Sequence, residues 1–369
     1  MIPVRRSLLK GGAALGALSA AAALVRAQAT STERRFAPQP GAWRTFDITT
    51  RVELADPVGA SRIWLPVPSI DSDWQRSLQS SFSSNGNARM ARDGVEGARM
   101  VYAEFAVGTK PVVEVTSRVQ TRNRADLAST RSVAREDAAT LQHYTRATRL
   151  LPTDGIVRQT ALAATKGAKS DEQKARAIYS WVVANAWREP KVRGCGEGDI
   201  KTMLETGNLG GKCADINALF VGLCRSVGLP ARDVYGIRLV PSAFGYKELS
   251  GNPASLKGAQ HCRAEVYLQA HGWVAMDPAD VAKVMRLETA EWLKTTDHPV
   301  VAPVYKHLFG GWEGNWLGWN TAHDLQLPGA KEGVLNFLMY PVAETAEGRV
   351  DSYSPDAFRY TITAREIAA

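Results

Sequence analysis

A cysteine that follows two glycines and opens an apolar helical pattern constrains this chain more than any other feature. Gly210 and Gly211 allow the backbone to turn tightly just ahead of Cys213. Apolar residues then recur at helical spacing, at Ile216, Leu219, Phe220 and Leu223. Because Pro230 cannot continue a helix, the pattern predicts a helix that begins at Cys213 and ends near Gly228.

A cysteine in this position is suited to act as a nucleophile. The thiolate is the reactive form, and the unpaired N–H groups and positive dipole end of a helix N-terminus lower the pKa of a thiol. The same N–H groups can face a developing oxyanion. Since a lone cysteine is more often a small buried apolar residue, the assignment of Cys213 requires partners elsewhere in the chain.

A histidine and an aspartate flank a predicted hairpin downstream of that helix. His261 opens one strand pattern, Asp277 closes the next, and a turn is predicted at residues 268–272. Their midpoint is Gln269, so the hairpin sets His261 and Asp277 opposite each other to within about two residues. A thiolate needs a base, and the base needs an orienting group. We therefore predict a Cys213–His261–Asp277 triad, with no metal and no cofactor.

Three separated blocks, in the same order, resemble the core of bacterial transglutaminase-like proteins, which are papain-like cysteine enzymes. The blocks are residues 211–232, 261–268 and 272–278, preceded by a glycine-rich approach at residues 194–199. The resemblance covers roughly residues 150–280. Residues 43–125, which include Trp64-Leu65-Pro66-Val67-Pro68, resemble the β-domain that often precedes this core.

The resemblance implies an α+β fold in which a helix-borne cysteine packs on an antiparallel sheet, preceded by a β-sandwich-like domain. It also implies an acyl-enzyme at Cys213, with His261 as general base and then acid, and Asp277 holding the imidazole. Arg263 departs from the pattern, because an aromatic residue is commoner there. We expect this departure to alter the wall of the cleft and the substrate preference.

The first 29 residues are predicted to be a targeting segment. Arg5-Arg6 followed by Ser7-Leu8-Leu9-Lys10 resembles the twin-arginine export signal. An Ala-rich run at residues 11–25 is too short and too weakly apolar to anchor in a bilayer, and residues 27–29 supply a small-x-small cleavage pattern. We expect the export machinery as a partner, a periplasmic location and no stable membrane anchor.

The rest of the chain divides into three predicted parts. Residues 30–42 are a flexible lead, and residues 43–125 alternate apolar and polar positions in short segments, as the strands of a β-domain do. Residues 126–369 form the catalytic domain, with its core at 150–280 and C-terminal strands within 330–365. A capping box at Ser170 and Gln173 predicts the start of a helix within that core.

Net charge excludes nucleic acid as a partner. The formal charge of +8 includes four basic residues within the targeting segment, which leaves +4 for the mature chain. The remaining basic residues are scattered among acids, with no stripe to follow a phosphate backbone.

The other cysteines and the tryptophans have less definite predictions. Cys224 is predicted to be core, whereas Cys195 and Cys262 flank site residues and leave a disulfide open. Asp199 either shapes the approach loop or caps a helix. Trp312, Trp316 and Trp319 favour core packing over a substrate wall.

The predicted reaction is attack of the Cys213 thiolate on an amide of a protein or peptide. Hydrolysis is favoured over cross-linking, because nothing in the sequence shows how water would be excluded. A protein cross-linker and a non-catalytic binding module of the same fold are the alternatives.

Overall fold

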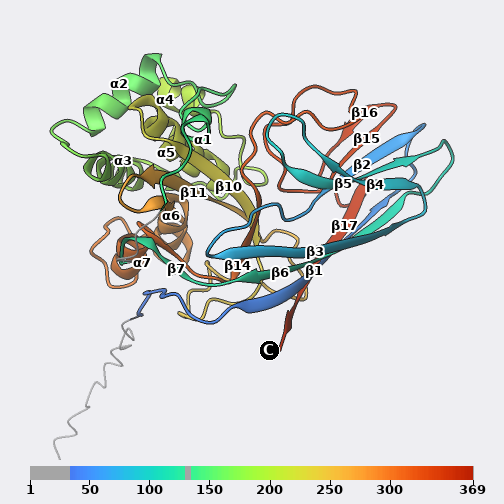
Figure 1. The fold of residues 1–369 in the computed structure, drawn as a ribbon, viewed down its shortest axis with the longest axis horizontal. Helices are drawn as coiled ribbons and strands as arrows, with labels where there is room; N and C mark the ends of the chain where they lie inside the picture. The colour runs from blue at the N-terminus through green and yellow to red at the C-terminus, as the bar shows by residue number, and fades with distance from the viewer. Residues whose placement is uncertain (1–33, 129–133, 369) are drawn as a thin grey trace, which may run out of the picture. The chain divides into compact units, whose positions relative to one another are not determined.

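The computed structural model describes residues 34–128 and 134–368, and within them the chain is a mixed α+β protein (Figure 1). The predicted targeting segment and residues 30–33 of the flexible lead lie outside the described residues. The described residues belong to a single compact unit. Within the described residues, no helix has both the length and the apolar character needed to cross a bilayer.

A four-stranded antiparallel sheet with strand order β12-β11-β10-β14 forms the centre of the predicted catalytic core. Its strands are β10 (Ala231–Arg238), β11 (Gln260–Leu268), β12 (Gly272–Met276) and β14 (Trp316–Asn320). The helices of this part are α1 (Ala138–His143), α2 (Gly155–Ala164), α3 (Asp171–Asn185), α4 (Ile200–Thr206), α5 (Cys213–Ser226), α6 (Pro278–Leu287) and α7 (Ala302–His307).

The central helix is α5, which packs against β10 and β11 and against α2, α3, α4 and α6. It begins at Cys213 and ends at Ser226, as predicted, and all its residues are buried. A helix enclosed on every side is apolar all round, which the sequence from Ala214 to Cys224 largely satisfies. The capping prediction for α3 is also confirmed, because the Ser170 side chain accepts a hydrogen bond from the Gln173 N–H.

The hairpin predicted around residues 268–272 is present. Strands β11 and β12 pair antiparallel, with Leu268 opposite Gly272 and Ala264 opposite Met276. Gly272 has a φ of 74°, a left-handed conformation that favours glycine at a tight turn. The hairpin therefore carries His261 at its first strand and delivers Asp277 directly after its second.

Two antiparallel sheets form the β-rich part that precedes the core in the sequence. Their strand orders are β17-β1-β6-β3 and β16-β15-β2-β5-β4. The strands are β1 (Arg44–Leu54), β2 (Ser61–Pro66), β3 (Gln75–Ser84), β4 (Asn87–Arg92), β5 (Arg99–Phe105), β6 (Val112–Thr121), β15 (Val342–Thr345), β16 (Gly348–Val350) and β17 (Phe358–Ile367). Buried side chains of both sheets belong to one apolar cluster, as in a β-sandwich.

The C-terminal strands differ from the sequence-based division. We expected them to belong to the catalytic domain, but β17 pairs with β1 along its whole length, and β15 pairs with β2 (Figure 1). Residues 336–340, which lie within the range predicted for C-terminal strands, form no strand. Pairing between distant segments leaves no local pattern in the sequence, which is why the division failed at this end.

Short pairings connect the β-rich part to the core. Strand β7 (Arg124–Ala125) pairs with β13 (Gly311–Trp312) and is followed directly by a 3₁₀ turn at Asp126–Ala128. The Gln75 side chain donates to the Gly318 carbonyl at 2.7 Å and accepts from the Gly318 N–H at 2.8 Å. A parallel pair, β8 (Trp187–Arg188) and β9 (Gly210–Gly211), leads into α5.

Candidate active site

Cys213 is the first residue of α5 and is almost fully buried, at 2% exposure. Its thiol has His261, Cys195 and Cys262 as neighbours that act on its pKa. Burial alone raises the pKa of this thiol, but the hydrogen bonds from Cys195, Cys262 and His261, together with the charge of His261, bring the pKa well below its usual value. The lowered pKa therefore favours the thiolate form of Cys213 at neutral pH.

Asp215 fixes the approach loop to the start of α5. One carboxylate oxygen accepts from the N–H groups of Glu197 and Gly198, both at 2.9 Å, and the other accepts from the Lys212 N–H at 2.9 Å. Gly196 has a φ of 87°, and a Cβ there would lie 1.8 Å from the Asp215 carboxylate. The glycine-rich approach is thus required by the close passage of this loop over Asp215.

The N–H groups at the start of α5 are fewer than the sequence suggested for an oxyanion. Ala214 donates its N–H to the Cys195 carbonyl at 2.9 Å, and Lys212 donates to Asp215.

Asp199, whose role the sequence left open, caps α4 by accepting from the Thr202 N–H at 3.1 Å.

His261 donates a hydrogen bond to Asp277 at the predicted hairpin. Its Nε2 lies 2.7 Å from Asp277 Oδ2, and both residues are buried. The ladder register sets Asp277 two positions away from direct opposition to His261, which is within the predicted tolerance. With Cys213 in contact on the same imidazole, the structure brings together all three residues singled out from the sequence.

Asp277 is held by further groups. Its Oδ1 accepts from the Asp280 N–H at 3.0 Å, so Asp277 is also the N-cap of α6. The Asn217 amide, from the first turns of α5, lies 3.4 Å from the same oxygen. Because both contacts come from rigid helices, the carboxylate that faces His261 has a fixed orientation.

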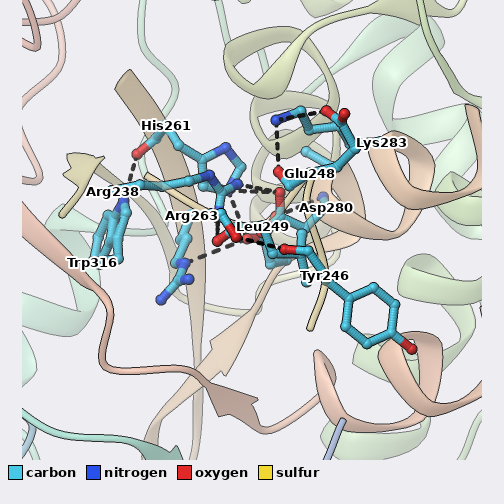
Figure 2. A network of polar contacts seen from close by, with 12 residues as sticks. Arg238, Tyr246, Glu248, Leu249, His261, Arg263, Asp280, Lys283 and Trp316 are labelled. Carbon is cyan, nitrogen blue, oxygen red and sulfur yellow. Dashed lines mark hydrogen bonds and ion pairs between the residues drawn. The ribbon is translucent and has the colours of Figure 1, made fainter. Parts of the chain in front are cut away.

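Sequence reasoning missed a second buried acid beside the imidazole. Asp280 Oδ1 lies 3.3 Å from His261 Nε2 and 2.5 Å from Arg238 Nη2, at the end of β10 (Figure 2). The Asp277-Pro278-Ala279-Asp280 sequence signals a helix start, and it gave no reason to place Asp280 at the site. Only the fold brings Arg238 to this carboxylate.

The pKa of His261 is raised by these acids. Burial and the positive charge of Arg238 lower the pKa of the imidazole, but the charges of Asp280 and Asp277 and the hydrogen bond that His261 donates to Asp277 outweigh them. The pKa of Asp280 is lowered, because burial is outweighed by the charges of Arg238 and His261. A lowered thiol pKa beside a raised imidazole pKa favours a thiolate–imidazolium pair.

Arg263 does not line the cavity wall, contrary to the expectation from the sequence. It is buried at 2% exposure behind the triad, where its Nε lies 3.5 Å from Asp277 Oδ2. Its guanidinium lies 4.6 Å from the centroid of Trp316. Desolvation lowers the pKa of Arg263 to about 10. Arg263 therefore acts on the triad from inside the protein.

The three tryptophans pack in the core, as favoured from the sequence. Trp312, Trp316 and Trp319 are each at most 2% exposed. Trp316 additionally donates its indole N–H to the His261 carbonyl at 2.8 Å (Figure 2).

All four cysteines are buried free thiols. Cys224 is fully buried in α5, where desolvation raises the pKa of its thiol well above the usual value, which fits the predicted core role. Cys195 accepts from the Tyr340 hydroxyl at 2.9 Å and contacts Cys213. Cys262 also contacts Cys213. Cys213 therefore has two thiol neighbours, Cys195 from an earlier part of the chain and Cys262 from a later part.

His261, Asp277 and Asp280 are the described residues whose geometry suits a metal ion, with candidate ligand atoms within 4.8 Å of one another. Two guanidinium groups already approach these carboxylates, Arg238 at 2.5 Å and Arg263 at 3.5 Å. Since these cations offset the acidic charge, the donor set fits a buried ion-pair network better than a metal site.

A cavity of about 50 Å³ opens beside Cys213 and His261. Its walls are mainly polar, and they include Arg188 from β8, Arg238 from β10 and Lys283 from α6. A substrate group that reaches Cys213 through this cavity therefore meets a basic surface.

Comparisons with known proteins agree with this fold. Residues 158–278 match the model of the transglutaminase-like superfamily. An uncharacterised protein of Haemophilus influenzae is 34% identical over 343 residues, with 87% of this chain and 91% of that protein covered. The crystal structure of a candidate cysteine protease from Cytophaga hutchinsonii superposes with a TM-score of 0.51 at 15% identity, over 89% of this chain and 100% of that one.

The matched region begins in α2 and ends just after Asp277, so it spans the helix of Cys213 and the hairpin of His261. The chain belongs to the transglutaminase-like superfamily.

Proposed function

We propose that the protein is a thiol-dependent amide hydrolase or acyltransferase that acts on protein or peptide substrates. The observation that carries the proposal is the chain of contacts from Cys213 through His261 to Asp277, buried at a helix N-terminus beside a polar cavity. Each residue has the environment that its role requires: a lowered thiol pKa, a raised imidazole pKa and a carboxylate fixed by α5 and α6.

The proposed reaction has two steps. The Cys213 thiolate attacks the amide carbonyl, the C–N bond breaks, and the His261 imidazolium gives its proton to the departing amine. The product is a thioester on Cys213. A water molecule then attacks the thioester while neutral His261 takes a proton from it, and the C–S bond breaks, which releases the carboxylic acid and restores the thiolate–imidazolium pair.

Hydrolysis is the proposed fate of the thioester, and a protein-glutamine cross-linker is the alternative within the same chemistry. If an amine replaces water in the second step, the same residues transfer the acyl group. A non-catalytic binding module of the same fold is the remaining alternative, and the intact Cys213, His261 and Asp277 argue against it.

We also propose that the protein is exported to the periplasm by the twin-arginine machinery. The support is the Arg5-Arg6 sequence and the apolar run that follows it. A test is to fuse residues 1–29 to a reporter and to replace both arginines by lysine, which is expected to stop export through this route.

The function is tested by incubation of the purified protein with a mixed peptide library under reducing conditions. Mass spectrometry then separates cleavage, deamidation and cross-linking in one experiment. We expect new peptide termini or deamidated glutamines that are absent with Cys213→Ala. Unchanged peptides across a broad library, with Cys213 shown to be reduced, would contradict the proposal and favour the binding module.

A further inference from the structure

One arginine beside the nucleophile has no counter-charge. Arg188 lines the cavity that opens on Cys213 and His261, and within the described parts of the chain its side chain has no hydrogen-bond or ion-pair partner. Its Nε is buried and unpaired. A buried donor without an acceptor is unfavourable unless a ligand supplies one.

The other cations of the cavity are already neutralised. Arg238 is paired with Asp280 at 2.5 Å, and Lys283 lies 3.3 Å from a Glu248 carboxylate oxygen (Figure 2). The acid that follows Arg188 in the chain, Glu189, accepts instead from the Lys191 N–H at 3.0 Å. The contrast singles out Arg188 as the cation that is available to a substrate.

The backbone holds Arg188 close to the reaction centre. Arg188 pairs with Gly211 in the parallel ladder of β8 and β9, two residues before Cys213. The Glu189 N–H donates to the Gly211 carbonyl at 2.8 Å, so the residue after Arg188 is also bonded to the strand that leads to Cys213. Strand pairing therefore sets the position of the Arg188 backbone relative to the Cys213 thiol.

A second unpaired cation directly precedes Cys213 in the chain. This residue is Lys212, which, in the part of the chain that the structure describes, has no ion-pair partner for its ammonium group. Burial and the positive charge of Arg188 both lower the pKa of Lys212, which places the two cations near each other. An anion between them would relieve this repulsion.

We propose that Arg188, assisted by Lys212, binds a carboxylate of the substrate next to the scissile amide. This inference rests on the proposed function and names its substrate class: acidic peptides that carry a carboxylate close to the bond that is attacked. A guanidinium suits this role because it binds a carboxylate through two parallel N–H···O bonds. The carboxylate can be an Asp or Glu side chain, or the free C-terminus of the peptide.

The test separates anion binding from turnover by means of two alkylating reagents. Iodoacetate carries a carboxylate next to its reactive carbon, and iodoacetamide carries a neutral amide in the same place. In both reactions the Cys213 thiolate displaces iodide and forms a thioether, so no peptide substrate is needed. The measured quantity is the ratio of the two alkylation rates at Cys213, followed by mass spectrometry.

We expect the iodoacetate-to-iodoacetamide ratio to fall roughly tenfold in Arg188→Gln, to be largely restored in Arg188→Lys, and to fall less in Lys212→Gln, since one charge-assisted contact is lost. Lys201→Gln, an exposed position on α4, is the matched control and should leave the ratio unchanged. A ratio in Arg188→Gln equal to that of the parent would overturn the proposal.

Peptide turnover then identifies the source of the carboxylate. Three matched peptides are compared: one with Glu next to the scissile amide, one with Gln there, and one with a free C-terminus at that distance. A preference for either acidic peptide that disappears in Arg188→Gln supports the proposal and names the source, whereas an equal preference in both proteins contradicts it. Absence of turnover in all three would contradict the proposed function, while the alkylation ratio would still decide the anion site.

Discussion

One oxygen of Asp277 faces both His261 and Arg263. Asp277 Oδ2 lies 2.7 Å from the imidazole Nε2 and 3.5 Å from the guanidinium Nε. The carboxylate is therefore shared between the group that it orients and a buried positive charge. This arrangement requires the ionised form of Asp277, because a neutral acid could not accept from His261 and also pair with the Arg263 charge.

Replacement of Asp277 by Asn should lower kcat far more than it changes KM. The amide cannot stabilise the imidazolium as a carboxylate does, so we expect a loss of about 10³-fold or more in kcat. Steady-state kinetics on any peptide that the parent cleaves measures the split. A parent-like kcat would mean that another group, such as Asp280, orients the imidazole.

Asp280 should contribute mainly to stability and to the pKa of His261. Asp280→Asn leaves Arg238 buried without its acid, and we expect the free energy of unfolding in urea to fall by about 3 kcal/mol or more. Asp56→Asn, at an exposed turn, is the matched control and should change it little. Loss of the Asp280 charge should also lower the pKa of His261, so the alkaline limb of the activity profile should move to lower pH.

The pH dependence of the Asp280 contribution has a definite sign. Because the folded-state pKa of Asp280 is lowered, its stabilisation is fully present above the ordinary pKa of an aspartate and is lost as the pH falls through the folded-state value. Urea unfolding of the parent and Asp280→Asn should therefore converge in strong acid. A constant difference between the two proteins down to the acid limit would contradict this assignment.

Oxidation should abolish the proposed activity reversibly through the thiols that neighbour Cys213. Hydrogen peroxide converts the Cys213 thiolate to a sulfenic acid, and attack by Cys195 or Cys262 then releases water and forms a disulfide. We expect activity to return with a thiol reductant. Peptide mapping identifies the partner, and replacing that partner by Ser should let excess peroxide carry the Cys213 sulfenic acid on to the sulfinic acid, which a thiol reductant does not reverse. Four free thiols and full activity after peroxide treatment would contradict this prediction.

Local sequence patterns predicted the parts of the site that are built locally. The glycine turn, the apolar spacing after Cys213 and the alternation on either side of Gln269 suffice for α5 and the hairpin, and these two elements carry the triad. The remaining contacts are between distant residues. Arg238 and Asp280 are 42 residues apart, and β17 reaches β1 from the other end of the chain. No periodicity encodes such pairings, and only the packed fold determines them.

The central claim is that Cys213 is a thiolate paired with the His261 imidazolium at neutral pH. The most direct test is the rate of alkylation of Cys213 by iodoacetamide from about pH 5 to about pH 9, with buried Cys224 as the internal control. We predict that Cys213 still reacts rapidly at mildly acidic pH, far faster than Cys224, and that this acid reactivity is lost in His261→Ala. A rate that rises only near the pKa of an ordinary thiol, unchanged by His261→Ala, would contradict the account.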